Sequence, residues 1–473
     1  METSDTPAAK PVAPPRLTQG PVLSSLLKLV VPMIIGLIAV ISQPVIDTYF
    51  VGLLGTRELA AMAYIFPVAF IVSSVLIGIG IGATAVISRS IGASDWSDVQ
   101  HATLHTFLLA LAATVGVAAL LLPLQDQVFQ LLGADETLIP LIKDYMSVYL
   151  AGMAIMGPSM ISSSALRARG DVTWSSLIMI ISAVTNAILD PLFIFGWEFI
   201  PALGLRGAAI ASLAANLFAG AAGMALLLRG DRMIALDLGG FDLMKQNWKR
   251  ILHVGLPSAL TNSITPISAA ILVAIVSDFG EAAVAGWGVA SRIEMMALII
   301  PLALSACIGP FVGQNMGAGK IQRMRDAMRL AFLLAAGYAL LIWAVLAVFA
   351  QPIAGAFDDN PDTIAYAATY LMAAPGAYPL YAFLMITAGA FNALGIPRPN
   401  MVLYTLKLVV IYLPVALYAA PRFGFEGVVA ANVLSNVIPG VLAVIWYKVR
   451  FPRPKAEPAQ GVPGDPALGF SKQ

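Results

Sequence analysis

The sequence predicts an all-α polytopic membrane protein, with 12 transmembrane helices in two pseudo-symmetric six-helix bundles. The 473 residues are 59% hydrophobic and only 11% charged, whereas about 25% of the residues of a soluble domain are charged. Apolar runs of about 20 residues, the length that crosses a bilayer, recur along the chain. Markers of the first half also return in the second half, which indicates a duplicated bundle.

Twelve apolar stretches are candidate spans. They are 26–51, 59–87, 101–123, 142–165, 173–197, 205–228, 252–277, 282–310, 327–350, 364–390, 400–420 and 426–447. The expected parts of the chain are an N-terminal tail (1–20), a first bundle (21–228), a linker (229–251), a second bundle (252–447) and a C-terminal tail (448–473).

The distribution of Lys and Arg orients these spans. Basic residues concentrate in one set of connections, above all in 229–251 and 320–329, whereas the opposite connections are mostly acidic. Because cytoplasmic loops carry the excess of Lys and Arg, both termini are expected in the cytoplasm. No cleavable signal is recognisable in residues 1–20, so the first helix itself would direct insertion into the membrane.

Three markers recur at one offset. The same residue type occurs again 225 positions after Pro32, Gly92 and Gly170, as Pro257, Gly317 and Gly395. Each half holds an even number of spans, so the halves share one orientation in the membrane. Parallel repeats of this kind are typical of transporters, whose substrate site lies between the halves.

The first span carries a carboxylate, a group that is costly to place in a lipid bilayer. Asp47 lies in an otherwise apolar run with Pro32 and Pro44. A carboxylate at the bilayer centre costs about 2.5–3.5 kcal/mol on insertion scales, so it normally faces protein or a wet cavity. Pro44 cannot donate to the carbonyl four residues earlier, which leaves a free backbone acceptor near Asp47.

The fifth span supplies partners for this aspartate. Asn186 and Asp190 are four residues apart and share a helix face, and Pro191 again frees a carbonyl beside them. Such a set suits a proton relay or a small-cation site, although Asp190 could instead stabilise a helix end near the outer surface. An offset of 225 places Leu272, Ile411 and Val415 at the positions of Asp47, Asn186 and Asp190. The polar set is therefore predicted in the first half only, which favours a functional role.

Several other residues are candidates for the wall of a central cavity. Arg292 either lines this cavity or, together with Glu294, lies near the outer surface, and Lys407 is expected to extend its ammonium group to the cytoplasmic interface. The candidate cavity residues are Met33, Met62, Met156, Arg292 and Tyr381. Methionine adapts to varied ligands, but it also fills helix packing.

Several motifs together resemble the multidrug and toxic compound extrusion (MATE) family and, within it, the DinF-like branch. They are the first helix with Pro32 and Asp47, SRSIGA (88–93), GQNMGA (313–318), RARGD (167–171) leading into NAILDPLFIFG (186–196), and GLRGAAIAS (204–212). The resemblance covers residues 20–450. It implies a monomeric antiporter of the bacterial inner membrane that exports cationic or amphipathic, drug-like compounds in exchange for protons or sodium, and we expect protons. The coupling residues it implies are Asp47, Asn186, Asp190 and Ser212, where relatives often have Thr, with a helix bend at Pro32.

Alternatives remain open. Another branch of the family uses acidic residues in the seventh and tenth helices, which this chain lacks, but Ser212 leaves sodium coupling open. A lipid-precursor flippase of the same superfamily would need more helices and more basic residues in its cavity. An enzyme would need a clustered catalytic set, and none is recognisable. We expect no cofactor, no bound metal other than a coupling ion, and no nucleic-acid partner, since the net charge is +1.

Overall fold

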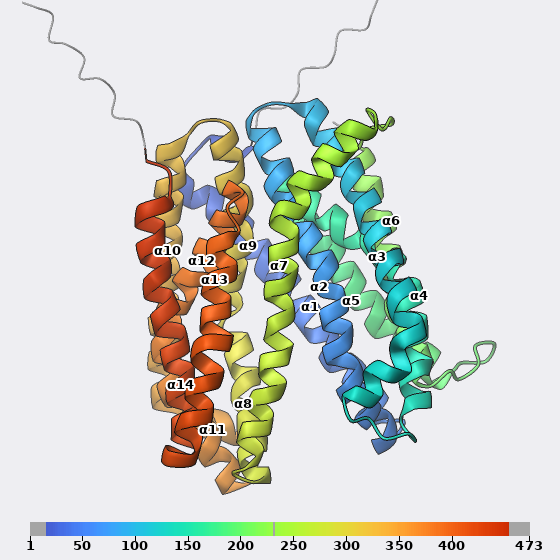
Figure 1. The fold of residues 1–473 in the computed structure, drawn as a ribbon, viewed down its shortest axis with the longest axis vertical. Coiled ribbons are helices and arrows are strands. Elements are labelled where there is room, and N and C mark those ends of the chain that lie inside the picture. Colours follow the sequence, from blue (N-terminus) through green and yellow to red (C-terminus); the bar gives the residue numbers. More distant parts are fainter. Residues whose placement is uncertain (1–15, 230–231, 454–473) are drawn as a thin grey trace, which may run out of the picture.

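A computed structural model describes residues 16–229 and 232–453, and these residues form helices joined by short connections (Figure 1). The α-helices are α1 (Val22–Gly52), α2 (Thr56–Gly92), α3 (Trp96–Leu131), α4 (Ile139–Arg169), α5 (Val172–Phe195), α6 (Leu205–Leu228), α7 (Phe241–Ser277), α8 (Glu281–Ala297), α9 (Ile299–Gly317), α10 (Ile321–Gly355), α11 (Pro361–Ala373), α12 (Tyr378–Leu394), α13 (Arg398–Thr405) and α14 (Leu413–Arg450). Short segments η1 (Arg16–Thr18) and η2 (Ala374–Ala377) are 3₁₀-helical, and η3 (Leu406–Tyr412) is a π-helix.

These helices combine into 12 spans, which confirms the predicted fold class. The eighth span is α8 followed by α9, and the tenth is α11, η2 and α12. The eleventh runs through α13 and η3 into α14, which kinks at Gly424 (φ +64°) and continues as the twelfth. A glycine is needed at this kink because other residues adopt positive φ only at a cost.

The two halves touch along α2, α7 and α9. The Cβ of any larger residue at Gly78 of α2 would overlap the carbonyl of Gly255 in α7, and one at Gly92 would overlap the carbonyl of Gln314 in α9. Glycines here let the helix backbones approach closely, as in many membrane helix pairs. The contact is reinforced by Gln314, whose Nε2 donates to the carbonyl of Ala168 in α4 at 2.7 Å.

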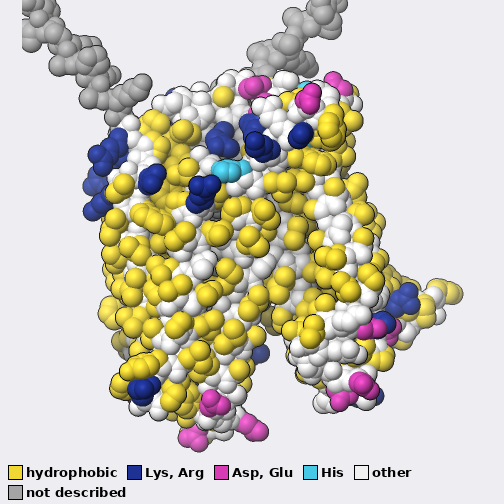
Figure 2. Space-filling model, viewed as in Figure 1, with side chains coloured by type: hydrophobic (Ala, Val, Ile, Leu, Met, Phe, Trp, Pro, Cys, Tyr) yellow, Lys and Arg dark blue, Asp and Glu magenta, His cyan; other side chains and the backbone are white. Residues whose placement is uncertain are grey.

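The halves separate at the opposite end. Figure 2 shows a hollow between two lobes at the lower end of the molecule, while the upper end is continuous. Most Lys and Arg side chains on this face lie toward the closed upper end, whereas Asp and Glu lie both at the tips of the lower end and at the upper end. The molecule is therefore closed at its basic end and open at the end that carries few Lys and Arg.

The predicted linker is partly helical. Helix α7 begins at Phe241, inside the predicted linker 229–251, so residues 241–251 of that segment are part of this helix. The early turns of α7 pack on the first half, because Trp248 and Ile251 join its hydrophobic core and Arg250 binds Asp98 of α3. Parts of the two predicted tails, residues 1–15 and 454–473, lie outside the described residues.

Removing the charge of Arg250 should loosen this attachment. Its Nη1 and Nη2 donate to the two carboxylate oxygens of Asp98 at 2.8 and 2.9 Å. We expect Arg250→Gln to lower the free energy of unfolding by about 1.5 kcal/mol, the low end of the range for hydrogen bonds to charged groups. The low end applies because the arginine side chain is 35% exposed. The apparent Tm of the purified protein measures this loss, with Lys249→Gln as the control at an exposed neighbouring position. A Tm equal to that of the control variant would contradict the attachment.

Candidate coupling site

Asp47 is buried near the end of α1, with its side chain against α5. The residue is only 6% exposed. Its carboxyl group lies beside the carboxyl group of Asp190 and the amide of Asn186, both on α5. One turn earlier Pro44 interrupts the hydrogen bonds of α1, and the carbonyl of Pro44 itself accepts from the Thr48 hydroxyl at 2.7 Å. Asp47 therefore lies in the interior of the first bundle, next to a weakened stretch of helix.

The other predicted partners meet at the same place. Asn186 and Asp190 are fully buried, and the Asn186 amide donates to Asp190 Oδ1 and to the Ser212 hydroxyl of α6, both at 3.2 Å. The structure thus brings together all four residues that the resemblance implies. We call them, with Tyr145, the aspartate cluster.

Tyr145 of α4 was missed by the sequence reasoning. It is 4% exposed, and its hydroxyl is next to Ser212 and close to both carboxyl groups. A tyrosine in an apolar span carries no pattern that separates it from core aromatics, so no sequence signal was available.

Asn216 was also missed; it donates to the Ser212 carbonyl and accepts from Ser159, which fixes α6 against α4. Its position four residues after Ser212 was a usable signal, because that spacing places both on one face.

Three buried oxygens in this cluster have no hydrogen-bond partner among the described residues. They are Asp47 Oδ1, Asn186 Oδ1 and Asp190 Oδ2. Unsatisfied buried acceptors cost about 1–3 kcal/mol each, and two adjacent carboxylates also repel each other. A proton on one carboxyl group relieves both costs, because it removes a charge and creates a donor. The arrangement can therefore exchange a proton, and its oxygens are also the ligands that a small hard cation prefers.

The candidate cavity residues are dispersed. Met33 and Met62 are buried in helix packing, 4% and 1% exposed, and Met156 packs at the edge of the first core. Arg292 is exposed, whereas Tyr381 is half-buried in the second bundle with the Lys407 ammonium over its ring. In this conformation these side chains do not form one wall.

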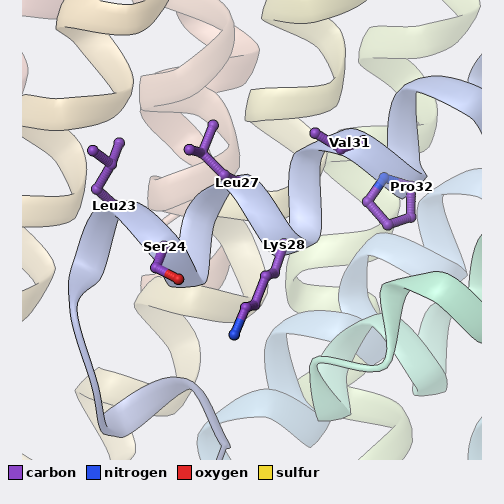
Figure 3. Close-up of a pocket in the computed structure, with 6 residues that line it drawn as sticks. All are labelled: Leu23, Ser24, Leu27, Lys28, Val31 and Pro32. Carbon is purple, nitrogen blue, oxygen red and sulfur yellow. The ribbon is translucent and has the colours of Figure 1, made fainter.

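Pro32 lies apart from the aspartate cluster. It lines an open groove of about 590 Å³ on the outside of α1, with Leu23, Ser24, Leu27, Lys28 and Val31 (Figure 3). Pro32 and Asp47 are about 22 Å apart along the helix axis, at 1.5 Å per residue. The groove is thus an exterior feature of the first turns of α1, and a bend at Pro32 would act on Asp47 through the helix rather than by contact.

One prediction about the second half is wrong. Lys407 does not extend to the interface: it is 7% exposed, and its ammonium donates to Asn436 of α14. Polar residues also meet in this half, at positions other than the equivalents of Asp47, Asn186 and Asp190, and Glu294 accepts there from the Tyr370 hydroxyl at 2.6 Å. The physical reason is local: the π-helix η3 rotates its side chains relative to a regular helix, so Lys407 faces the bundle.

The repeated bundles, the cleft between them and a buried carboxyl cluster define a membrane transporter rather than an enzyme. The chain belongs to the MatE family, whose model matches residues 32–192 and again residues 257–418. The two matches begin 225 residues apart, the same offset as the sequence markers.

Relatives cover nearly the whole chain. A protein of Shewanella oneidensis named FAD transporter is 34% identical over 90% of this chain and 94% of its own length. The multidrug export protein MepA of Staphylococcus aureus is 24% identical over the same shares. Among solved structures, an outward-facing multidrug resistance MATE transporter is similar with a TM-score of 0.86 and 26% identity, covering 94% of this chain and 99% of that one. The bent form of VcmN from Vibrio cholerae has a TM-score of 0.82 and 29% identity, covering 90% and 96%.

Proposed function

We propose that this protein is an antiporter that exports small amphipathic compounds in exchange for protons, coupled by Asp47. The observation that carries the proposal is the aspartate cluster, where two carboxyl groups and an amide meet out of water with unsatisfied oxygens. Ionisable residues inside a membrane span mark ion pathways by default. Asn186, Asp190, Ser212 and Tyr145 would position Asp47 and bind its proton.

Coupling follows if proton and substrate favour different conformations. A protonated Asp47 can donate to Asp190, which draws α1 toward α5, whereas an ionised Asp47 repels that carboxylate. The prolines at positions 32 and 44 make α1 the helix most able to bend in response. A bend would reduce the space between the halves and release the substrate. Coupling requires only that the proton and the substrate each bind one of the two conformations more tightly than the other.

The direction of export rests on the charge asymmetry. We assign the basic, closed end to the cytoplasm and the open end to the outside of a bacterial inner membrane, by the excess of Lys and Arg in cytoplasmic loops. This would be the conformation that releases substrate and takes up protons.

A second candidate substrate is flavin adenine dinucleotide. It is favoured by the 34% identity to a protein named FAD transporter and by the buried Lys407, which suits an anion better than a cation. This substrate would leave the proton coupling at Asp47 unchanged, since the aspartate cluster and Lys407 lie in different bundles.

Transport into proteoliposomes separates the alternatives. Ethidium and FAD are offered in turn, first with a proton gradient and then with a sodium gradient as the only driving force. We expect transport with the proton gradient and none above the leak with sodium alone. Transport driven only by sodium would contradict proton coupling, and movement of lipid-linked precursors instead of either probe would indicate a flippase.

A further inference from the structure

The second bundle contains a buried polar group of its own, which we call the lysine cluster. Its members come from five elements of that bundle. They are Glu294 (α8), Tyr370 (α11), Tyr378 and Tyr381 (α12), Lys407 (η3) and Asn436 (α14). No member occupies the position that an offset of 225 would give to Asp47, Asn186 or Asp190, so the cluster is not a copy of the aspartate cluster.

Lys407 is the centre of this cluster. Its ammonium donates to Asn436 Oδ1 and lies 3.4 Å from the centroid of the Tyr381 ring. Among the described residues, no carboxylate oxygen forms a salt bridge with it; Glu294 acts on it only from a longer distance. An ammonium has three donors. One amide oxygen and one ring face therefore do not fully compensate the Lys407 ammonium for the hydration that it loses on burial. A buried cation held this way attracts an anion.

The helices that carry Glu294, Tyr378 and Lys407 are interrupted beside these residues. Glu294 lies four residues before the junction of α8 and α9 at Leu298. The 3₁₀ segment η2 separates Tyr370 from Tyr378, and Lys407 lies within the π-helix. Irregular backbone at membrane depth is tolerated where it lines protein or a cavity, and interrupted helices mark the binding sites of transporters. The interruptions are an observation independent of the charges.

The cluster also has an unused polar group and an accessible edge. Tyr378 is 1% exposed, and its hydroxyl has no hydrogen-bond partner among the described residues although Glu294 is its neighbour. Glu294, Tyr381 and Tyr404 are half-buried rather than buried. A ligand could therefore reach Lys407 past tyrosine rings, on which planar rings stack.

We propose that the lysine cluster is a binding site for an anionic group carried by an aromatic ring system. Lys407 and the Asn436 amide bind the carboxylate or phosphate, the Tyr378 hydroxyl donates to it, and Tyr381 stacks against the ring. Glu294, held by Tyr370, limits the affinity so that the ligand can leave again. This inference rests on the second candidate substrate proposed above, an anionic flavin, and names its site; it does not depend on the proton coupling.

FMN and riboflavin test the proposal, because they share one ring system and differ by a phosphate. Binding of each to the purified, full-length protein is measured by calorimetry in detergent. We expect FMN to bind about tenfold more tightly than riboflavin, the factor that corresponds to 1.4 kcal/mol. Lys407→Gln should remove this preference, and Lys143→Gln, which alters a half-exposed lysine paired with Asp126, should keep it.

Further variants exclude indirect effects. If Lys407→Gln does not fold, Tyr381→Leu keeps the cation and should weaken both flavins by a similar factor. Asp47→Asn should retain the preference for FMN, which separates this site from the proton coupling. Equal affinities for the two flavins, no FMN binding at millimolar concentration, or an unchanged preference in Lys407→Gln would each overturn the proposal.

Discussion

Asp47→Asn is expected to slow proton-driven export strongly while the protein still folds. Asparagine has nearly the same size and can replace the hydrogen bonds of a protonated aspartate, but it cannot release a proton. A coupling free energy of about 1–3 kcal/mol corresponds to a 5–150-fold effect, and we expect a loss in this range. The measurement is the initial rate of ethidium or FAD transport into proteoliposomes at a fixed proton gradient.

The control for this variant makes the same chemical change at the surface. Asp278 caps the end of α7 and is exposed. Asp278→Asn should therefore transport at the wild-type rate. If both variants transport like the wild type, Asp47 does not couple export to protons.

Gly78→Val is expected to prevent closure of the basic end. A side chain at position 78 would overlap the Gly255 carbonyl and the Ala259 backbone of α7, which cannot move without separating the halves. Overpacking of this kind costs about 1–3 kcal/mol. The single cysteine, Cys307, reports the separation, because it is buried in α9 close to Arg167 of α4. Its reaction with a maleimide should become faster in Gly78→Val, and the export rate should fall.

Gly116→Val is the matched control. Gly116 lies within α3, and a Cβ there would meet no atom within 4 Å. It should leave both the labelling rate and the export rate unchanged. Equal labelling of Cys307 in Gly78→Val and Gly116→Val would show that close contact of α2 and α7 does not hold the end closed.

Much of the first bundle could be predicted from the sequence, for physical reasons. Hydropathy identifies the spans because lipid tolerates few charges, and the same cost singles out Asp47 and Asp190. The four-residue spacing of Asn186 and Asp190 places them on one face, as the structure has them. Tyr145 could not be found this way, because packing between α4 and α6 decides which tyrosines approach the carboxyl groups.

The second bundle was harder to predict. Comparison of equivalent positions along the repeat tests only whether Leu272, Ile411 and Val415 are polar, so it overlooked a cluster at other positions. The orientation of Lys407 depends on a π-helical turn, which no residue pattern in 406–412 announces. The start of α7 at Phe241 could not be located from hydropathy, because the turns before residue 252 are less apolar than the span and pack on the first bundle.

Proton release from the purified protein tests the central claim most directly. Ethidium or FMN is added to the protein in weakly buffered detergent solution, and the change in pH is followed with an indicator dye. If the proton on the aspartate cluster and the substrate favour different conformations, the wild type releases about one proton for each substrate bound, and Asp47→Asn releases none. An equal release from wild type and Asp47→Asn, with equal substrate binding, would contradict the assignment of proton coupling to Asp47.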